Sequence, residues 1–371
     1  MKKCIAFLFA LILGVNGYAQ RYLGGDISLL PAYKANGTVY KNKDGRAACP
    51  YEIFKESGWN AMRVRLFVNP DNAPQADKDE GVCQDLDYVV GLCKQIKNHG
   101  FKLMLDFHYS DTWADPGKQF MPATLADAVK GKNREEQIRI LADSVYSHTF
   151  NSLTALVAAG AEPDLIQVGN EITFGTLWPT GKVDPMKDDN WDALLTFLKA
   201  GVKACREVCP KARLIIHTEH AQDWLTTQAY YDKLAKGKLD YDVIGLSYYP
   251  MWHGTVKHLD TVLDSLKTEF GKPVMIVETA FYYSHKNDKW EPDPNHYGDL
   301  YPISVGGQRR FTEELVTMLG KHDDVVGLFW WFPEENESGR PVIKSWINRG
   351  LFDNETGKLL PAMHELKNYI H

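Results

Sequence analysis

Beyond its first twenty residues, the sequence lacks any apolar run long enough to cross a bilayer. It also lacks blocks of lysine and arginine, because its 42 basic and 48 acidic residues are spread along the chain and give a net charge of −6. Nothing in this pattern therefore predicts binding to nucleic acid or to an anionic membrane surface. No serine-, glycine- or proline-rich linker and no low-complexity stretch divides the chain, so we expect one folded domain after the N-terminal segment.

Cysteine is scarce, with six residues, of which Cys4 lies in the N-terminal segment. The others are odd in number, so at least one thiol stays unpaired, and the sequence alone gives no pairing. Cys205 and Cys209 lie four residues apart in a helical pattern and share a face, so we expect them to pack as small apolar side chains. A zinc site would need further ligands at suitable spacing, and none accompany this pair.

The N-terminal segment reads MKKCIAFLFALILGVNGYAQ. Two lysines precede an apolar stretch of about ten residues and a small-residue ending, which is typical of a secretory signal peptide. We therefore predict a signal peptide at residues 1–19 and a single folded domain at residues 20–371. Cys4 precedes the apolar stretch and cannot be the lipidated cysteine of a lipoprotein. We expect the mature protein to be a secreted monomer, periplasmic or extracellular, with no transmembrane segment.

Strand-like and helix-like runs alternate along the rest of the chain, which is the pattern of parallel βα units. The strand candidates are residues 22–28, 60–67, 101–108, 164–170, 213–218, 241–249, 273–279 and 325–332. Helical patterns occupy residues 86–100, 191–209, 261–271, 306–320 and 361–371. Strand candidates of this number, with helices between them, predict an α/β protein: a single-domain (β/α)₈ TIM barrel.

Two glutamates end two of the strand-like runs, Glu171 in DLIQVGNEI and Glu278 in KPVMIVETA. Because catalytic groups of (β/α)₈ barrels lie at the carboxyl ends of strands, we expect both to face one cleft. Two carboxyl groups can cleave a glycosidic bond, one as acid/base and the other as nucleophile. Further polar and aromatic residues at predicted strand ends are Asp26, Ser28, Arg63, Arg65, Asp106, His108, Asn170, His217, Ser247, Tyr248, Tyr249, Trp330 and Trp331. Such groups suit the hydroxyl edges and apolar faces of a sugar.

Several longer segments follow one another along the chain: GGDIS, RVRLF, LDFHYSDTWADPGKQ, QVGNEI, IGLSYYPMWHG, IVETA and GLFWWFP. They resemble the motifs of glycoside hydrolase family 53, the endo-β-1,4-galactanases, in the family's order and over nearly the whole chain. The resemblance implies a retaining barrel glycosidase with Glu171 as acid/base and Glu278 as nucleophile. It also implies internal hydrolysis of β-1,4-galactan, the side chain of type I arabinogalactan and pectin, so the expected partners are this polysaccharide and galacto-oligosaccharides.

The resemblance further implies substrate-binding residues around the two glutamates. They are Arg63, Arg65, His108, Asp111, Trp113, Asn170, Tyr248, Tyr249, Trp252 and Trp331. Asn170 can bond the sugar 2-hydroxyl, an interaction that strengthens in the transition state. A nearby arginine would keep Glu278 ionised. One of the two adjacent tyrosines resembles the residue that hydrogen-bonds the nucleophile, and Trp331 resembles the ring beneath the cleaved sugar.

The chain departs from the family pattern in two places. The fifth strand-like run ends in HTEHAQD, where relatives more often carry an asparagine-containing segment, so the roles of His217 and Glu219 stay open. The loop after Glu278 occupies a place where some bacterial members bind calcium. Oxygen ligands for a structural calcium could come from Asp288, Asp293, Asn295 and Asp299. The alternative is a solvated acidic loop, and we expect no cofactor to be required for catalysis.

Other functions stay open at this point. A related retaining barrel glycosidase would act on β-mannan, xylan or β-glucan, although the HYSDTWADPGKQ segment favours galactan. A sugar-binding barrel that had lost catalysis would not need both glutamates. A metal-dependent hydrolase would need clustered His and Asp ligands at strand ends, where only His108 and His217 are available.

Overall fold

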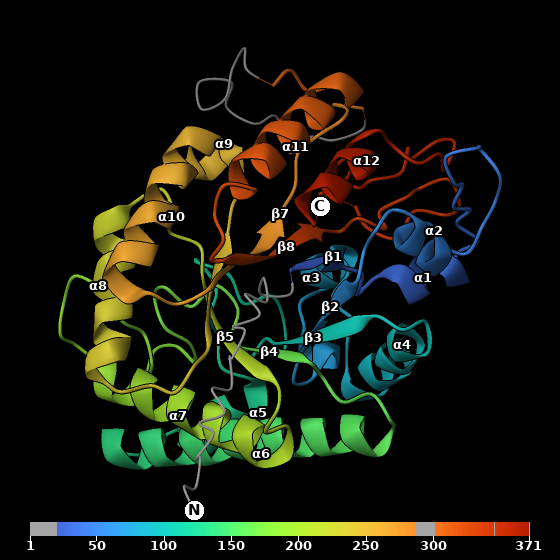
Figure 1. The fold of residues 1–371 in the computed structure, drawn as a ribbon. Coiled ribbons are helices and arrows are strands. Elements are labelled where there is room, and N and C mark those ends of the chain that lie inside the picture. Colours follow the sequence, from blue (N-terminus) through green and yellow to red (C-terminus); the bar gives the residue numbers. More distant parts are fainter. Residues whose placement is uncertain (1–20, 287–300, 345, 371) are drawn as a thin grey trace, which may run out of the picture.

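A closed barrel of parallel strands organises the chain (Figure 1). The computed structural model describes residues 21–286, 301–344 and 346–370. The strands are β1 Tyr22–Asp26, β2 Ala61–Leu66, β3 Lys102–Phe107, β4 Leu165–Val168, β5 Arg213–Thr218, β6 Val243–Ser247, β7 Val274–Thr279 and β8 Val325–Trp331. They pair in chain order, and β8 closes on β1. The (β/α)₈ prediction is confirmed, whereas the predicted signal peptide lies outside the described residues.

Helices surround the barrel and return the chain to the start of the next strand. Up to β4 they are α1 Leu30–Ala35, α2 Pro50–Glu56, α3 Gln75–Asp79, α4 Leu86–Asn98, α5 Ala123–Val129 and α6 Arg134–Ala158. After β4 they are α7 Trp191–Val208, α8 Trp224–Lys236, α9 Pro250–His253, α10 Val256–Phe270, α11 Val305–Leu319 and α12 Ala362–Leu366. Short 3₁₀ turns lie at Pro70–Asn72 and Lys367–Tyr369. Within the described part of the chain, no helix combines the length and apolarity needed to cross a membrane.

Helix ends follow local capping chemistry. α4 begins after Asp85, whose side chain accepts the Tyr88 amide, and it ends before Gly100, which has a left-handed φ of +79°. α10 begins five residues before the predicted pattern, because the Thr255 side chain caps it. The sequence analysis misses α6. Its buried stripe contains Thr149 and Ser152, which interrupt the apolar periodicity that marks an amphipathic helix.

The barrel interior is apolar at the amino ends of the strands and polar at their carboxyl ends. All the strands contribute to one apolar cluster: Tyr22, Ala61, Met104, Leu165, Ile215, Val243, Met275, Val277, Val326 and Phe329. Side chains alternate along a strand, so the residue two positions further also points inward. These next inward positions include Arg63, Asp106, Gln167 and His217, all fully buried. The strand period thus carries polar groups to the end of the barrel where (β/α)₈ enzymes have their active sites.

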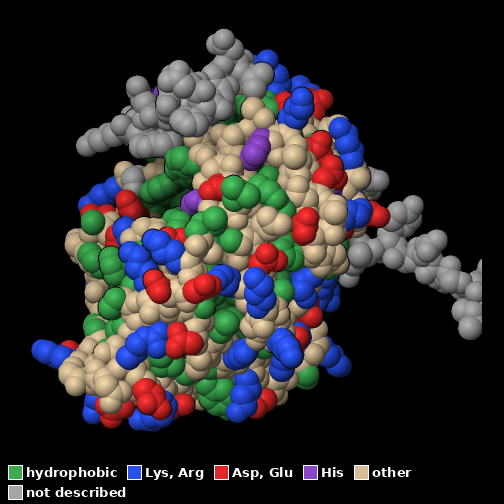
Figure 2. All heavy atoms as spheres, turned by 90° about the vertical axis from the view of Figure 1, so that its left-hand side faces the viewer, with side chains coloured by type: hydrophobic (Ala, Val, Ile, Leu, Met, Phe, Trp, Pro, Cys, Tyr) green, Lys and Arg blue, Asp and Glu red, His purple; other side chains and the backbone are tan. Residues whose placement is uncertain are grey.

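The outer surface carries charges of both signs. Figure 2 views the side on which α8 and α10 lie, and there Lys and Arg side chains are interspersed with Asp and Glu side chains. The described cysteines, Cys49, Cys83, Cys93, Cys205 and Cys209, are free. Cys205 and Cys209 are buried in the apolar core, as the sequence predicts.

Gly24 in β1 tests how closely the strands pack inside the barrel. A Cβ atom there would lie 2.1 Å from the carbonyl oxygen of Ala61 and 3.1 Å from the Phe329 ring. We expect Gly24→Ala to lower the free energy of unfolding by about 2–3 kcal/mol, because the β2 backbone cannot retreat without losing its pairing.

Gly91→Ala is the matched control, because Gly91 lies within α4 and an added Cβ would have nothing within 4 Å. This change should raise the free energy of unfolding by about 0.5–1 kcal/mol. Urea denaturation measures both variants. Equal stability of the two would show that the interior accommodates a methyl group at Gly24.

Candidate active site

A cleft of about 320 Å³ opens at the carboxyl ends of the strands. It is lined by Glu80, His108, Trp113, Ala114, Asp115, Lys118, Asn170, Glu171, Tyr249, Trp252, Glu278, Trp331 and Trp346. The cleft therefore combines tryptophan rings with carboxyl groups. This composition suits a ligand that has apolar faces and hydroxyl edges.

The backbone turns sharply where β4 delivers Glu171 to the cleft. Gly169 has a φ of +92°, and Glu171 itself has a φ of +49°, in the left-handed region that side-chain-bearing residues rarely adopt. The Gln119 side chain holds this turn, because its Nε2 donates to the carbonyl oxygens of Asn170 at 2.8 Å and Glu171 at 3.2 Å. Strained backbone held by its surroundings is common at functional sites.

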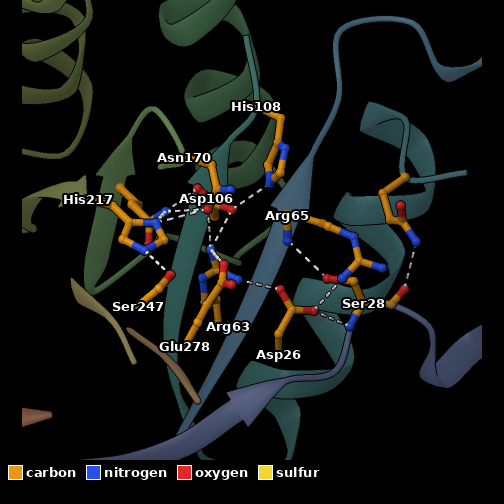
Figure 3. A network of polar contacts seen from close by, with 12 residues as sticks. Asp26, Ser28, Arg63, Arg65, Asp106, His108, Asn170, His217, Ser247 and Glu278 are labelled. Carbon is orange, nitrogen blue, oxygen red and sulfur yellow. Dashed lines mark hydrogen bonds and ion pairs between the residues drawn. The ribbon is translucent and has the colours of Figure 1, made fainter. Parts of the chain in front are cut away.

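Arg63 is the centre of a buried ionic network (Figure 3). One terminal nitrogen lies 2.9 Å from the Asp26 carboxylate, and the other lies 2.7 Å from Asp106 and 2.8 Å from Glu278. Asp26 also binds Arg65 at 2.9 Å, which adds a second positive charge to the network. Buried charges of opposite sign in direct contact stabilise each other's ionised form. The expected cation beside Glu278 is thus Arg63.

Arg65 has a different place from Arg63. Its guanidinium lies against two neighbouring rings, 4.7 Å from the centroid of Trp113 and 4.7 Å from that of Phe332. Phe332 in turn stacks on Trp331 at 3.7 Å. Arg65 thus pairs with Asp26 and not with Glu278 in the described contacts. It stabilises the positions of Trp113 and Phe332 by cation–π contact.

Tyr249 contacts the second oxygen of Glu278, to which its hydroxyl donates at 3.0 Å. Tyr248 points elsewhere: its hydroxyl donates to the Gly254 carbonyl at 2.9 Å, and its ring packs against Phe311. Of the two tyrosines left open by the sequence, the structure brings Tyr249 to the cleft and not Tyr248. The period of two from the inward-facing Ser247 would have selected the same residue.

Glu171 is held by Ser247, which in turn contacts His217 (Figure 3 shows the contact between Ser247 and His217). Ser247 Oγ donates to Glu171 Oε1 at 2.6 Å, and His217 Nε2 lies 2.8 Å from Ser247 Oγ. His217 Nδ1 lies 3.3 Å from the Glu171 backbone nitrogen and 2.9 Å from the Asn170 side-chain oxygen, so the ring is held on both sides. Burial and the charge of Arg63 hold the pKa of His217 well below its usual range, so the ring stays neutral.

Electrostatic surroundings separate the two glutamates. Burial raises the pKa of Glu171 well above its usual range, and the negative charges of Glu278 and Glu219 raise it further. Burial also raises the pKa of Glu278, but the adjacent Arg63 guanidinium opposes that rise. Glu278 therefore loses its proton first, and Glu171 stays protonated beside it. One neutral and one ionised carboxyl group are what combined acid and nucleophilic chemistry requires.

Glu219, whose role the sequence left open, lies behind Glu171. Its carboxylate is buried and accepts a hydrogen bond of 2.9 Å from Thr173, two residues after Glu171. It thus stabilises the turn that carries Glu171.

Two predicted binding residues, His108 and Asn170, line the cleft and are fixed by hydrogen bonds. His108 Nε2 donates to Asp106 at 2.9 Å, and its Nδ1 accepts the Ala114 amide at 3.1 Å. Asn170 donates to the Ala114 carbonyl at 2.8 Å and accepts from Arg63 at 2.8 Å. Both side chains therefore have set orientations.

Asp111 is not among the residues that line the cleft. Its carboxylate accepts hydrogen bonds from the Asn72 side chain at 3.0 Å and the Ala123 amide at 2.9 Å, and so joins two loops. The structure thus does not bring Asp111 to the place the sequence predicts for it.

Trp346 is the main cleft residue that the sequence analysis missed. Its ring lies 5.5 Å from that of Trp331 and 5.6 Å from that of Trp252. It lies fifteen positions after Trp331, the last residue of β8, and residues 332–344 and 346 form no helix or strand, so no strand end marks it. Asp115 and Lys118 were also missed as separate residues, although both lie in the motif LDFHYSDTWADPGKQ.

The candidate calcium ligands Asp288, Asp293, Asn295 and Asp299 lie outside the described residues. Within residues 21–286, 301–344 and 346–370, no group of three or more His, Cys, Asp or Glu side chains could hold a metal ion.

The sequence model of glycosyl hydrolase family 53 matches residues 22–366. The chain belongs to this family. A "Probable arabinogalactan endo-beta-1,4-galactanase A" of Aspergillus fumigatus is 32% identical over 84% of this chain and 83% of its own length. The solved "Ignisphaera aggregans GH53 catalytic domain" superimposes with a TM-score of 0.81 at 29% identity, over 94% of this chain and 96% of that chain. A structure of fungal beta-1,4-galactanases has a TM-score of 0.77 at 29% identity, over 94% of this chain and 99% of that one.

The hydrogen bond from Ser247 to Glu171 favours the ionised form of the carboxyl group, so its loss should favour the protonated form. We expect Ser247→Ala to raise the pKa of Glu171, and any activity that requires protonated Glu171 should persist to higher pH. ¹³C NMR titration of labelled glutamate carboxyls measures this shift. Ser144→Ala is the control, because Ser144 lies on α6 and bonds the Ile140 carbonyl. A lowered or unchanged pKa in Ser247→Ala would contradict the assigned hydrogen bond.

Proposed function

We propose that this chain hydrolyses internal β-1,4-galactosidic bonds of galactan and type I arabinogalactan, by a retaining double displacement. Glu171 is the acid/base and Glu278 the nucleophile. The observation that carries the proposal is the difference between the two carboxyl groups in one cleft: Arg63 and Tyr249 contact Glu278, while burial beside other carboxylates keeps Glu171 protonated. Membership of family 53 and the names of the relatives support the choice of galactan.

In the first step Glu278 attacks the anomeric carbon while Glu171 donates its proton to the leaving oxygen, which yields a glycosyl-enzyme and a shortened chain. In the second step Glu171 takes a proton from water, which displaces Glu278 and returns the sugar with its original configuration. The charge that Glu278 regains is stabilised by Arg63 and by the Tyr249 hydroxyl. In this proposal Asn170, the neighbour of Glu171, bonds the sugar 2-hydroxyl.

The tryptophans of the cleft provide ring faces for successive galactosyl units. Trp331 and Trp113 lie near each other, with centroids 6.3 Å apart, and Trp252 and Trp346 continue the aromatic lining. Stacking on apolar sugar faces tolerates a polymer that extends past the cleft in both directions, which favours internal cleavage. The predicted signal peptide agrees with such a role, because polysaccharide must be met outside the cytoplasm. We therefore propose a secreted enzyme that needs no metal for catalysis.

The substrate is tested by release of reducing ends from linear β-1,4-galactan, β-mannan, xylan and β-glucan. We expect activity on galactan and none comparable on the others. Glu278→Ala should lower kcat on galactan by about 10⁴-fold or more, because the nucleophile is removed. External azide should restore part of the rate in Glu278→Gly. Preferred cleavage of another polysaccharide would overturn the substrate, and an active Glu278→Ala would overturn the nucleophile.

Stereochemistry tests the two glutamates jointly. Double displacement requires carboxyl groups about 5 Å apart, and two inversions at the anomeric carbon return the β configuration. Proton NMR of the first products should show the β-anomer before mutarotation sets in. An α-anomer at early times would mean direct attack by water, and Glu278 would then act as a base and not as a nucleophile.

A further inference from the structure

The segment from Trp346 to Gly350 contributes Trp346 to the lining of the cleft and has an unusual backbone conformation. Trp346 has a φ of +64° and Asn348 a φ of +65°, both in the left-handed region that side-chain-bearing residues rarely adopt. Two such residues in so short a segment indicate that contacts outside the segment impose its shape.

One carboxylate accepts hydrogen bonds from three backbone N–H groups of this segment. Glu335 is fully buried, and its Oε1 accepts the Asn348 amide at 2.9 Å. Its Oε2 accepts the Arg349 amide at 2.9 Å and the Gly350 amide at 2.7 Å. The Asn354 side chain donates to Oε1 as well, at 2.5 Å. Three consecutive backbone N–H groups thus converge on both oxygens, which therefore act as acceptors, as in an ionised carboxylate.

Close packing makes this arrangement specific. A Cβ atom at Gly350 would lie 2.6 Å from the carbonyl oxygen of Glu335 and 3.0 Å from its Oε2. The Gly350 backbone can approach the carboxylate only because it carries no side chain. The carbonyl group of Arg349 is held too, since Trp330 Nε1 donates to its oxygen at 2.8 Å.

The clamped backbone in turn fixes the ring of Trp346. The Arg349 guanidinium lies 3.9 Å from the centroid of Trp346 and 5.4 Å from that of Trp331. Arg349 thus lies over two of the rings that line the cleft, Trp331 and Trp346. A shift of the Arg349 backbone would move this cation away from Trp346 and release the ring.

We propose that Glu335 is a positioning residue that holds Trp346 in place for sugar units next to the one being cleaved. The proposal rests on the proposed galactan hydrolysis. Glu335 touches neither Glu171 nor Glu278 in the described contacts, so its effect is on binding of the polymer and not on the chemical step. A residue that only stabilised the fold would leave the KM of the folded enzyme unchanged, so the kinetics separate the two roles.

The principal test is Glu335→Gln, which keeps the size of the side chain but turns an acceptor oxygen into an N–H donor facing backbone N–H groups. We expect KM for linear β-1,4-galactan to rise about tenfold, the loss typical of one aromatic contact, with kcat within about twofold of wild type. Trp346→Ala should give the same rise. The double variant should be no worse than either single variant, because both changes remove one interaction.

Asp164→Asn is the matched control. Asp164 immediately precedes β4, at the opposite end of the barrel from the cleft, and its carboxylate likewise holds a backbone amide, that of Leu103 at 3.0 Å. This change should lower thermal stability and leave KM unaltered. Asn354→Ala, which removes one donor to Glu335 and keeps the three backbone donors, is the milder variant if Glu335→Gln does not fold. It should raise KM by about threefold.

Hydrogen–deuterium exchange gives a readout that needs no substrate. The amides of residues 348–350 should exchange slowly in wild type and faster in Glu335→Gln or Asn354→Ala, and unchanged exchange would overturn the clamp. Unchanged KM in Glu335→Gln, or additive losses in the double variant, would overturn the positioning role. Wild-type protein that released no sugar from galactan would instead overturn the proposed function, while the exchange measurement would still decide whether the clamp exists.

Discussion

The ionic bonding of Arg63 is the constraint on which the rest of the active site depends. An arginine with no solvent contact is tolerated in a barrel interior only if its charge is compensated directly. Arg63 on β2 meets that condition with carboxylates from β1, β3 and β7, namely Asp26, Asp106 and Glu278. The same contacts join neighbouring and distant strands at their carboxyl ends. The Arg63 guanidinium therefore has two effects. It joins the strands at the polar end of the barrel, and it stabilises the ionised form of Glu278 away from bulk water.

Glu171 and Glu278 belong to one hydrogen-bonded system rather than two separate ones. A continuous chain of contacts links them through Ser247, His217, Gln167, Asp106 and Arg63. Every link is buried or nearly so, and interactions between buried polar groups are less screened than those in water. The neutral His217 sits in the middle of this chain. A change of charge at either glutamate therefore affects the pKa of the other, both through the chain of hydrogen bonds and by direct electrostatic interaction.

Much of the fold follows from the sequence, because the barrel strands are short, largely apolar runs that alternate with helical patterns. In β2, β3 and β5 a period of two is also visible, since a polar residue recurs on the inward side. The same period places Arg63, Asp106 and His217 inside the barrel. The features that the sequence analysis missed are those without a clear local pattern of residues. α6 is hidden by Thr149 and Ser152 on its buried side. Trp346 is held at the cleft by left-handed backbone, by hydrogen bonds from the amides of residues 348–350 to Glu335, and by the Arg349 guanidinium. None of these features can be recognised in the local sequence.

Gln119 shows that the loops around the cleft are not interchangeable parts. Its side chain donates to the carbonyl groups of Asn170 and Glu171, and its own carbonyl accepts the Trp178 amide at 2.7 Å. One residue of the segment after β3 is thus built into the segment after β4. A loop transplanted from a relative to alter substrate choice would have to bring an equivalent amide with it, or the turn that presents Glu171 would lose its support. Changes in the segment after β3 are consequently coupled to changes in the segment after β4, so we expect these two loops to vary together.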